Sequence, residues 1–118
     1  MILVDTSVWV DHFRRGEPLL QDLLHAGKVV THPFIIGELA CGHLRRRAEI
    51  LQWLAALPMI KLAEHEEVLH LVQEKAAHGK GLGWIDVHLL ASALLARVSL
   101  WTKDKKLANF TRILLIHE

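Results

Sequence analysis

The sequence predicts an α/β domain built on a short parallel sheet with helices on both of its faces. Two observations carry this prediction. Short apolar runs alternate with longer amphipathic runs, as about five strands and seven helices would along the 118 residues. The first apolar run, Ile2 to Val4, has no polar alternation and ends on a carboxylate, Asp5. This pattern is typical of a strand that is buried on both faces and delivers an acid to the sheet edge.

The first two helices are expected to follow this strand directly. Thr6 or Ser7 can cap a helix that begins near Val8 and ends ahead of Gly16. Pro18 suits the first turn of a second helix, which is expected to run to about residue 26. Such short connections keep consecutive elements adjacent in space.

The next stretch contains a second strand and a helix with a lone charge. Residues 29–31 are predicted to form a short strand, and Pro33 starts a helix that is apolar on nearly every side. Glu38 is the one charged residue of that helix, and a lone charge on an apolar helix needs a reason. Residues 44–57 have the amphipathic pattern of a surface helix that ends before Pro58.

The middle of the chain continues the alternation. Residues 59–62 are predicted as a short strand, and residues 64–78 as a helix with an acidic first turn. A glycine-rich loop at 79–83 leads into a helix over 84–97. Asp86 shares a face of this helix with the apolar residues three, four, seven and eight positions further on. We therefore expect Asp86 to point toward the core.

The C-terminal stretch is predicted to add two more strands. Residues 98–102 form the first of them, and a short helix opens at Lys103. Asp104 follows the end of that strand, as Asp5 follows the first one. Residues 112–116 are expected to form the last strand. No internal repeat or linker interrupts the sequence, so residues 1–118 are expected to form a single domain.

Composition excludes several classes of protein. A hydrophobic fraction of 52% excludes a disordered chain, and the longest apolar stretch, 89–96, is interrupted by Ser92 and too short to cross a bilayer. Because no basic segment precedes the first apolar run, we expect no targeting peptide and a cytoplasmic protein without a membrane partner. The lone cysteine, Cys41, cannot form an internal disulfide and is expected to be a small core residue.

The net charge of +1 is uninformative, but the distribution of charge is not. If four acids gather in one site, 14 basic residues stand against the nine acids that remain. Much of the excess lies in clusters at 14–15, 45–47 and 103–106, which predicts an acidic site on a basic surface. The cluster at 45–47 suits an RNA or protein contact, and equally a solvated helix face.

Four carboxylates are predicted to meet at the carboxyl edge of the sheet. Asp5 and Asp104 follow strands, while Glu38 and Asp86 lie on apolar helix faces. Gathered carboxylates repel one another unless a cation neutralises them, and an all-oxygen cluster suits Mg²⁺ or Mn²⁺ rather than zinc. Such an ion lowers the pKa of bound water and stabilises a displacement at phosphorus. The pattern favours hydrolysis of a phosphate ester, with the basic rim holding a polyanion.

Other sites fit the sequence less well. His65, His70 and His78 are spaced by five and eight residues, not by the four that put two zinc ligands on one helix face. The loop at 79–83 follows a helix and lacks the glycine spacing of nucleotide-binding loops. A phosphoacceptor receiver domain would need a strand ending near residue 50, within the predicted surface helix.

Further expectations concern the polar and aromatic residues outside this set. Asp11 and His12 are expected to be helix-surface residues. The four tryptophans are expected to be core or dimer contacts rather than base-stacking platforms.

Four short blocks, in this order and spacing, span essentially the whole chain. They are Val4-Asp5-Thr6-Ser7-Val8-Trp9-Val10-Asp11, Ile36-Gly37-Glu38-Leu39, Trp84-Ile85-Asp86-Val87-His88-Leu89-Leu90-Ala91 and Leu100-Trp101-Thr102-Lys103-Asp104. Together they resemble the PIN-domain ribonucleases, and specifically the VapC-type toxins of bacterial type II toxin–antitoxin pairs. The resemblance implies a three-layer α/β/α sandwich around a mostly parallel sheet.

The resemblance also implies a function and its residues. Asp5, Glu38, Asp86 and Asp104 would be the metal-binding and catalytic acids of a Mg²⁺- or Mn²⁺-dependent endoribonuclease, with the hydroxyls of Thr6 and Thr102 beside them. A homodimer and a VapB-like antitoxin that blocks the site would be its partners. Many relatives carry another acid and a Phe where this sequence has Lys106 and Leu107, which implies weaker metal binding at the fourth acid.

A competing interpretation is a non-catalytic PIN scaffold that binds RNA or protein. Retention of all four acids argues against it, because a binding module has no need to keep like charges together.

Overall fold

Three parallel strands form the sheet of the computed structural model, which describes residues 1–115. β1 (Ile2–Val4) lies between β2 (Val29–Val30) and β3 (Ser99–Trp101). Residue 2 is aligned with residues 29 and 99, so the three strands end at the same edge. Leu3 and Val4 are fully buried, which confirms the prediction of a central strand covered on both faces.

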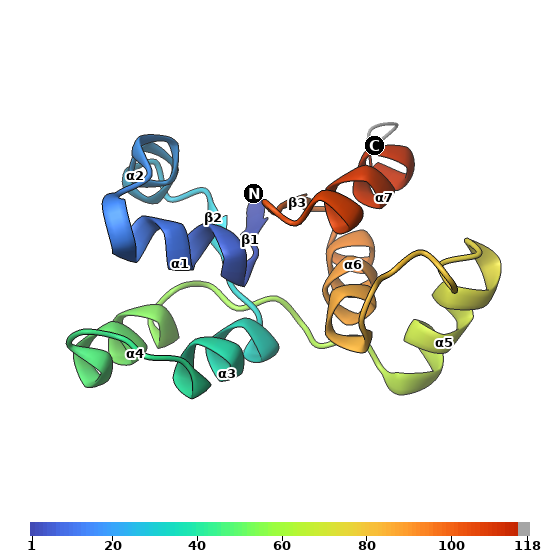
Figure 1. The fold of residues 1–118 in the computed structure, drawn as a ribbon, viewed down its shortest axis with the longest axis horizontal. Helices are drawn as coiled ribbons and strands as arrows, with labels where there is room; N and C mark the ends of the chain where they lie inside the picture. Colours follow the sequence, from blue (N-terminus) through green and yellow to red (C-terminus); the bar gives the residue numbers. More distant parts are fainter. Residues whose placement is uncertain (116–118) are drawn as a thin grey trace.

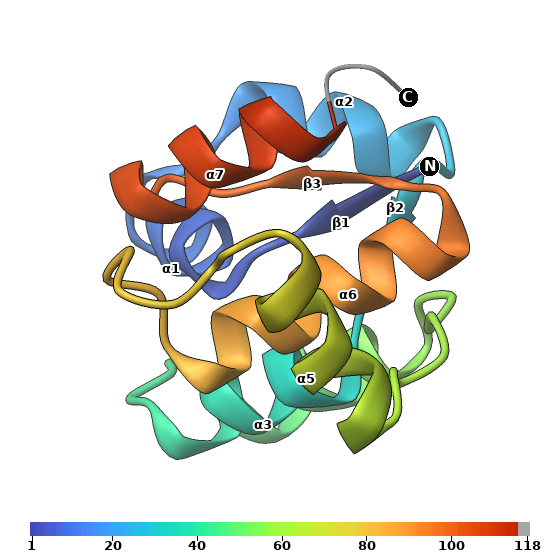
Figure 2. The ribbon, with the colours of Figure 1, turned by 90° about the vertical axis from the view of Figure 1, so that its right-hand side faces the viewer.

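Seven helices surround the sheet within the described residues, as predicted. They are α1 (Thr6–Arg15), α2 (Pro18–His25), α3 (Pro33–Cys41), α4 (Arg47–Ala55), α5 (His65–Glu74), α6 (Trp84–Ala96) and α7 (Lys105–Leu115). Figure 1 shows α1 and α2 to one side of the strands and α6 and α7 to the other, with α3 and α4 below α1. Figure 2 shows β1 and β3 side by side, with α7 above them and α6 below. The chain is therefore an α/β fold with a parallel sheet.

Within the described residues the sheet has three strands, fewer than the five or so that were predicted. Residues 59–62 form no strand and contribute one isolated parallel bridge, between Met59 and Thr31. Met59 and Leu62 remain substantially exposed, so little apolar burial supports a longer pairing there.

The predicted last strand is a helix as far as it is described. α7 continues to Leu115, and residue 116 lies outside the described residues. Leu107 and Phe110 are buried one turn apart, which is the spacing of a helix face. A short apolar run does not by itself distinguish a strand from a buried helix segment, so the run was assigned the strand period although it belongs to a helix.

Several helix bounds also differ from those predicted. α1 begins two residues earlier than expected because Asp5, not Thr6 or Ser7, occupies its N-cap position. α4 covers less than residues 44–57 because Arg46 adopts a left-handed conformation that breaks the helix ahead of residue 47. α5 ends before residue 78 because Ala76 is also left-handed.

The expectation that Cys41 is a core residue is wrong. Cys41 and Gly37 are both exposed, four residues apart on the solvent face of α3. Among the tryptophans, Trp9 is in the core, whereas Trp53 is largely and Trp84 partly exposed. No helix in the described part of the chain is long and apolar enough to cross a bilayer.

A buried histidine joins the sheet to two helices. The His32 Nδ1 atom accepts a hydrogen bond from the Phe34 N–H at 3.0 Å and so caps α3. The proton of the neutral ring therefore lies on Nε2, which donates to the Ser92 Oγ atom at 3.0 Å. Ser92 Oγ also accepts from the Ala63 N–H at 3.1 Å. Burial lowers the pKa of His32 to about 4, with a smaller contribution from His88.

Candidate functional site

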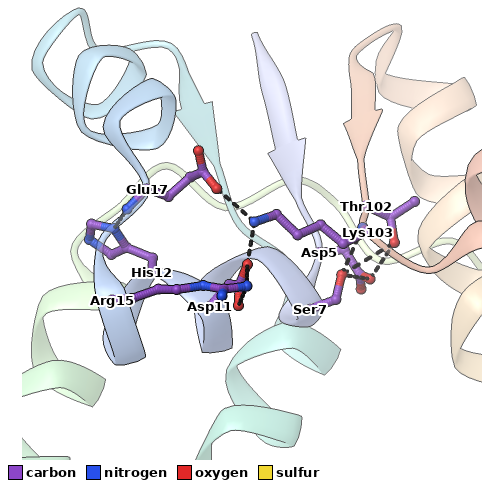
Figure 3. Close-up of polar contacts among 8 residues, drawn as sticks. All are labelled: Asp5, Ser7, Asp11, His12, Arg15, Glu17, Thr102 and Lys103. Carbon is purple, nitrogen blue, oxygen red and sulfur yellow. Dashed lines mark hydrogen bonds and ion pairs between the residues drawn. The ribbon is translucent and has the colours of Figure 1, made fainter.

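Asp5 lies at the carboxyl end of the central strand. Its side chain is buried, and its Oδ2 atom accepts hydrogen bonds from the Ser7 hydroxyl at 2.9 Å and the Thr102 hydroxyl at 2.7 Å. Although Asp5 occupies the N-cap position of α1, its carboxylate makes no capping hydrogen bond. Figure 3 shows the two hydroxyls directed at this one carboxylate. The first strand therefore delivers an oriented acid to the sheet edge, as predicted.

The end of β3 is tied to the same place. The Asp5 N–H donates to the Trp101 carbonyl at 2.9 Å, and the Lys103 N–H donates to the Ser7 Oγ atom at 3.0 Å. Thr102, directly after β3, is buried beside Asp5. The ends of two neighbouring strands thus share one hydrogen-bond network, since residues that follow parallel strands emerge at the same edge.

Glu38 reaches this region from α3. Its Oε1 atom accepts a hydrogen bond of 2.6 Å from the Thr6 hydroxyl, and both side chains are half-buried. The lone charge on this apolar helix therefore faces the first turn of α1, next in sequence to Asp5. The Thr6 hydroxyl therefore donates to Glu38 and does not cap α1, as the sequence had suggested it could.

Asp86 reaches the site from the first turn of α6. Its Oδ2 atom accepts from the Gly83 N–H at 2.9 Å, which satisfies one of the free donors at the helix start. Burial raises the pKa of the Asp86 carboxyl, against the lowering effect of that hydrogen bond. The carboxylates of Asp5 and Asp104 raise this pKa further, so three of the four predicted acids lie within electrostatic reach of one another.

Asp104 is the most exposed of the four acids. Its Oδ1 atom accepts from the backbone N–H groups of Lys106 at 2.9 Å and Leu107 at 3.0 Å, and so caps α7. Its own N–H donates to the Thr102 hydroxyl at 3.1 Å. Asp104 thus has a structural role as the cap of α7 as well as the predicted place among the acids.

The four carboxylates share a bonding pattern. Each uses one oxygen to accept hydrogen bonds, and the second oxygen of each accepts none from the described residues. Free carboxylate oxygens are the ligands that Mg²⁺ and Mn²⁺ prefer, so the donor chemistry fits such an ion. No three His, Cys, Asp or Glu side chains of residues 1–112 lie close enough together to hold a metal ion as they stand. The acids therefore border a common region without forming a closed ligand shell.

An ion-pair cluster flanks this region. Lys103 pairs with Asp11 and with Glu17 at 2.6 Å, and Asp11 also pairs with Arg15 at 3.0 Å (Figure 3). The hydrogen bond from Lys103 lowers the pKa of Asp11, and in return Asp11 raises the pKa of Lys103. Asp11 lies on the surface of α1, as expected, and its ion pair with Lys103 also connects α1 to the loop after β3.

Sequence reasoning missed the part played by Ser7. Its hydroxyl links the Asp5 carboxylate to the Lys103 backbone, across 96 positions of the sequence between Ser7 and Lys103. The available signal was a hydroxyl two residues after a strand-end acid, a position at which serine commonly turns back to hydrogen-bond nearby groups.

Comparisons with known proteins agree with this geometry. The family model of the PIN domain matches residues 2–113. The chain is 44% identical over 108 residues to Ribonuclease VapC32 of Mycobacterium tuberculosis strain CDC 1551 / Oshkosh, covering 91% of this chain and 87% of that relative. Its counterpart in strain ATCC 25618 / H37Rv matches to the same extent.

Proposed function

The chain belongs to the PIN-domain family, and from that premise we propose that it is a metal-dependent endoribonuclease, the toxin of a VapBC-type toxin–antitoxin pair. The observation that carries the proposal is the gathering of Asp5, Asp86 and Asp104, three acids from separate elements, at one sheet edge, close enough that the charges of Asp5 and Asp104 raise the pKa of Asp86. The extensive identity to a protein named a ribonuclease supports RNA as the substrate.

The four acids would hold Mg²⁺ or Mn²⁺ through their free oxygens. Such an ion supplies Lewis-acid chemistry, which lowers the pKa of water and neutralises charge on a phosphodiester. The chain's own contribution is orientation. Ser7 and Thr102 fix one oxygen of Asp5, Thr6 fixes one oxygen of Glu38, and the Gly83 N–H does the same for Asp86. Carboxylates held by neighbouring hydrogen bonds lose less freedom when they bind a ligand.

RNA cleavage by the purified chain tests the proposal. We expect RNA to be cut in Mg²⁺ or Mn²⁺ and left intact in excess chelator, and Asp5→Asn to lose at least about 100-fold in rate while remaining folded. Asp22→Asn, on the exposed face of α2, is the matched control and should cut as the parent does. Undiminished cleavage by Asp5→Asn, or full activity in chelator, would refute the metal mechanism. A folded parent that cuts no RNA would favour a binding scaffold.

The proposed partners are RNA, a VapB-like antitoxin and a second copy of the chain in a homodimer, with the cytoplasm as the proposed location. Expression of the chain alone should then arrest growth, and co-expression of the protein encoded beside it should restore growth. Normal growth of cells that contain folded, unmutated protein would contradict the toxin assignment.

A further inference from the structure

A hollow between α1, α3 and α4 opens beside the candidate site. Its volume is about 730 Å³, and Thr6 and Glu38 form part of its wall. The remainder of that wall is lined by Arg14, Arg45, Arg46, His43 and mostly apolar side chains. We call this hollow the arginine pocket. Because Glu38 belongs to both the candidate site and the arginine pocket, a ligand that reaches the acids can continue into the pocket.

The three arginines of the pocket are available to a ligand. All three are exposed, and within the described residues they take part in no ion pair, whereas the neighbouring Arg15 is held by a carboxylate. Among the charged side chains of the pocket, three guanidinium groups stand against the single carboxylate of Glu38. The pocket therefore carries an excess of positive charge next to a group of acids.

The backbone of the pocket's loop is held in place. The Arg47 side chain donates from Nε and Nη2 to the Ala40 carbonyl, at 3.2 and 3.0 Å, and so fixes the start of α4 to the end of α3. Arg46 has φ 55° and ψ 43°, a left-handed conformation that residues other than glycine rarely adopt. Unfavourable backbone conformations that the surrounding structure maintains are concentrated at functional segments.

We propose that the arginine pocket binds RNA and holds a backbone phosphate of a nucleotide next to the cleaved bond on Arg14, Arg45 and Arg46. This inference rests on the proposed function, because it places the cleaved bond at the acids. Guanidinium groups match phosphate oxygens in pairs, which makes unpaired arginines suitable ligands for a nucleic-acid backbone. Pockets of 300–1,000 Å³ hold ligands of about nucleotide size, and half-buried Phe13 adds an apolar surface.

Electrostatics explains why such a pocket is needed here. Carboxylates at the sheet edge repel a polyanion, so RNA gains affinity from cations placed along its path on either side of the acids. On sequence alone, the cluster at 45–47, which includes Arg45 and Arg46, suited an RNA or protein contact and equally a solvated face. Its continuity with Glu38 and its lack of ion pairs favour the RNA contact.

RNA affinity in chelator tests this inference without catalysis. Fluorescence anisotropy of a labelled short single-stranded RNA would be measured over a range of salt concentrations for the parent and for Arg45→Ala/Arg46→Ala. The matched control is Lys28→Ala/Arg97→Ala, which removes the same charge at the opposite edge of the sheet, where β2 and β3 begin. Arg14→Ala provides a second, independent variant on α1, should the double variant alter the loop.

We expect the double arginine variant to bind RNA at least about tenfold more weakly. Its plot of log affinity against log salt should be shallower by about 0.7 for each RNA phosphate that the protein no longer neutralises. Arg14→Ala should weaken binding in the same direction. The control should stay within about twofold of the parent. Circular dichroism would verify that each variant is folded, and a gel would verify that the RNA stays intact.

Two results would overturn the inference: arginine variants that bind RNA as the control does, or a parent that binds no RNA. Arginine variants that keep RNA binding but lose binding of a polyglutamate peptide would reassign the pocket to an acidic protein partner. Failure of the proposed function would look different, because RNA would then bind through the arginines and remain uncut in Mn²⁺.

Discussion

His32 should make the folded chain lose stability as the pH falls below neutral. Its ring is fully buried and neutral, with a pKa of about 4 in the folded state against 6.5 for a solvated histidine. Because the folded pKa is the lower one, the unfolded chain binds the proton first. The His32 contribution is therefore complete above about pH 6.5 and is lost as the pH falls towards 4. For these two pKa values the loss between about pH 7.5 and pH 5 is about 2 kcal/mol.

Urea unfolding at these two pH values would measure this loss for the parent and for His32→Asn. Asparagine can still cap α3 but leaves Ser92 without its donor, so the variant should be less stable near neutral pH by about 1–3 kcal/mol. Between the two pH values it should lose about 2 kcal/mol less than the parent. His25→Asn, at an exposed histidine, should reproduce the parent's curve. Equal losses in the parent and His32→Asn would refute the assignment of a buried neutral ring.

Three further predictions follow from individual side chains. Asp86→Asn should melt higher than the parent in chelator and gain less from Mn²⁺, because burial and neighbouring acids raise the pKa of Asp86. For the same reason the metal-free parent should gain stability as the pH falls from neutral towards 3.8. A variant that melts lower, together with a parent whose melting is unchanged by metal, would contradict this prediction. Gly79→Ala and Gly81→Ala should each lose about 1 kcal/mol of folding free energy, because both positions have a left-handed backbone and a Cβ at Gly81 would meet only the exposed Lys106 side chain, which can move aside; a much larger loss for Gly81→Ala in urea titrations would contradict this. Lys103→Met should lower the stability only slightly at low salt and almost not at all at high salt, since its two ion pairs are screened by solvent and salt; a loss independent of salt would show that they are not the cause.

Local patterns in the sequence were sufficient to find the candidate acids. Asp5 and Asp104 follow strands, and Glu38 and Asp86 are charges on apolar helix faces, all of which can be recognised within a few residues. The structure brings Asp5, Asp86 and Asp104 within electrostatic reach, while the role of all four as metal ligands stays a prediction. The resemblance placed the hydroxyls of Thr6 and Thr102 beside the acids, but which carboxylate each hydroxyl bonds could not be predicted from local patterns. Thr102 donates to Asp5 across 97 positions, and such a contact depends on packing that no local pattern encodes.

The fold was predictable where a segment had a clear pattern, and not where it was short. A buried strand such as Ile2–Val4 and a long periodic helix such as α6 have unambiguous patterns. Residues 59–62 and 112–116 do not, because such short, mostly apolar runs, interrupted or flanked by a charge, fit either period. Their structure is decided by whether a partner strand or a capping residue is available, and Asp104 supplies the cap for α7.

Binding of Mn²⁺ tests most directly the claim that carboxylates from four separate elements form one metal-dependent nuclease site. Isothermal titration calorimetry would compare the parent, Asp5→Asn and the exposed control Asp22→Asn, each checked for folding by circular dichroism. We predict that the parent and the control bind Mn²⁺ alike, and that Asp5→Asn binds at least about tenfold more weakly because the site loses a charged ligand. Equal Mn²⁺ affinity in all three proteins would contradict a site built around Asp5.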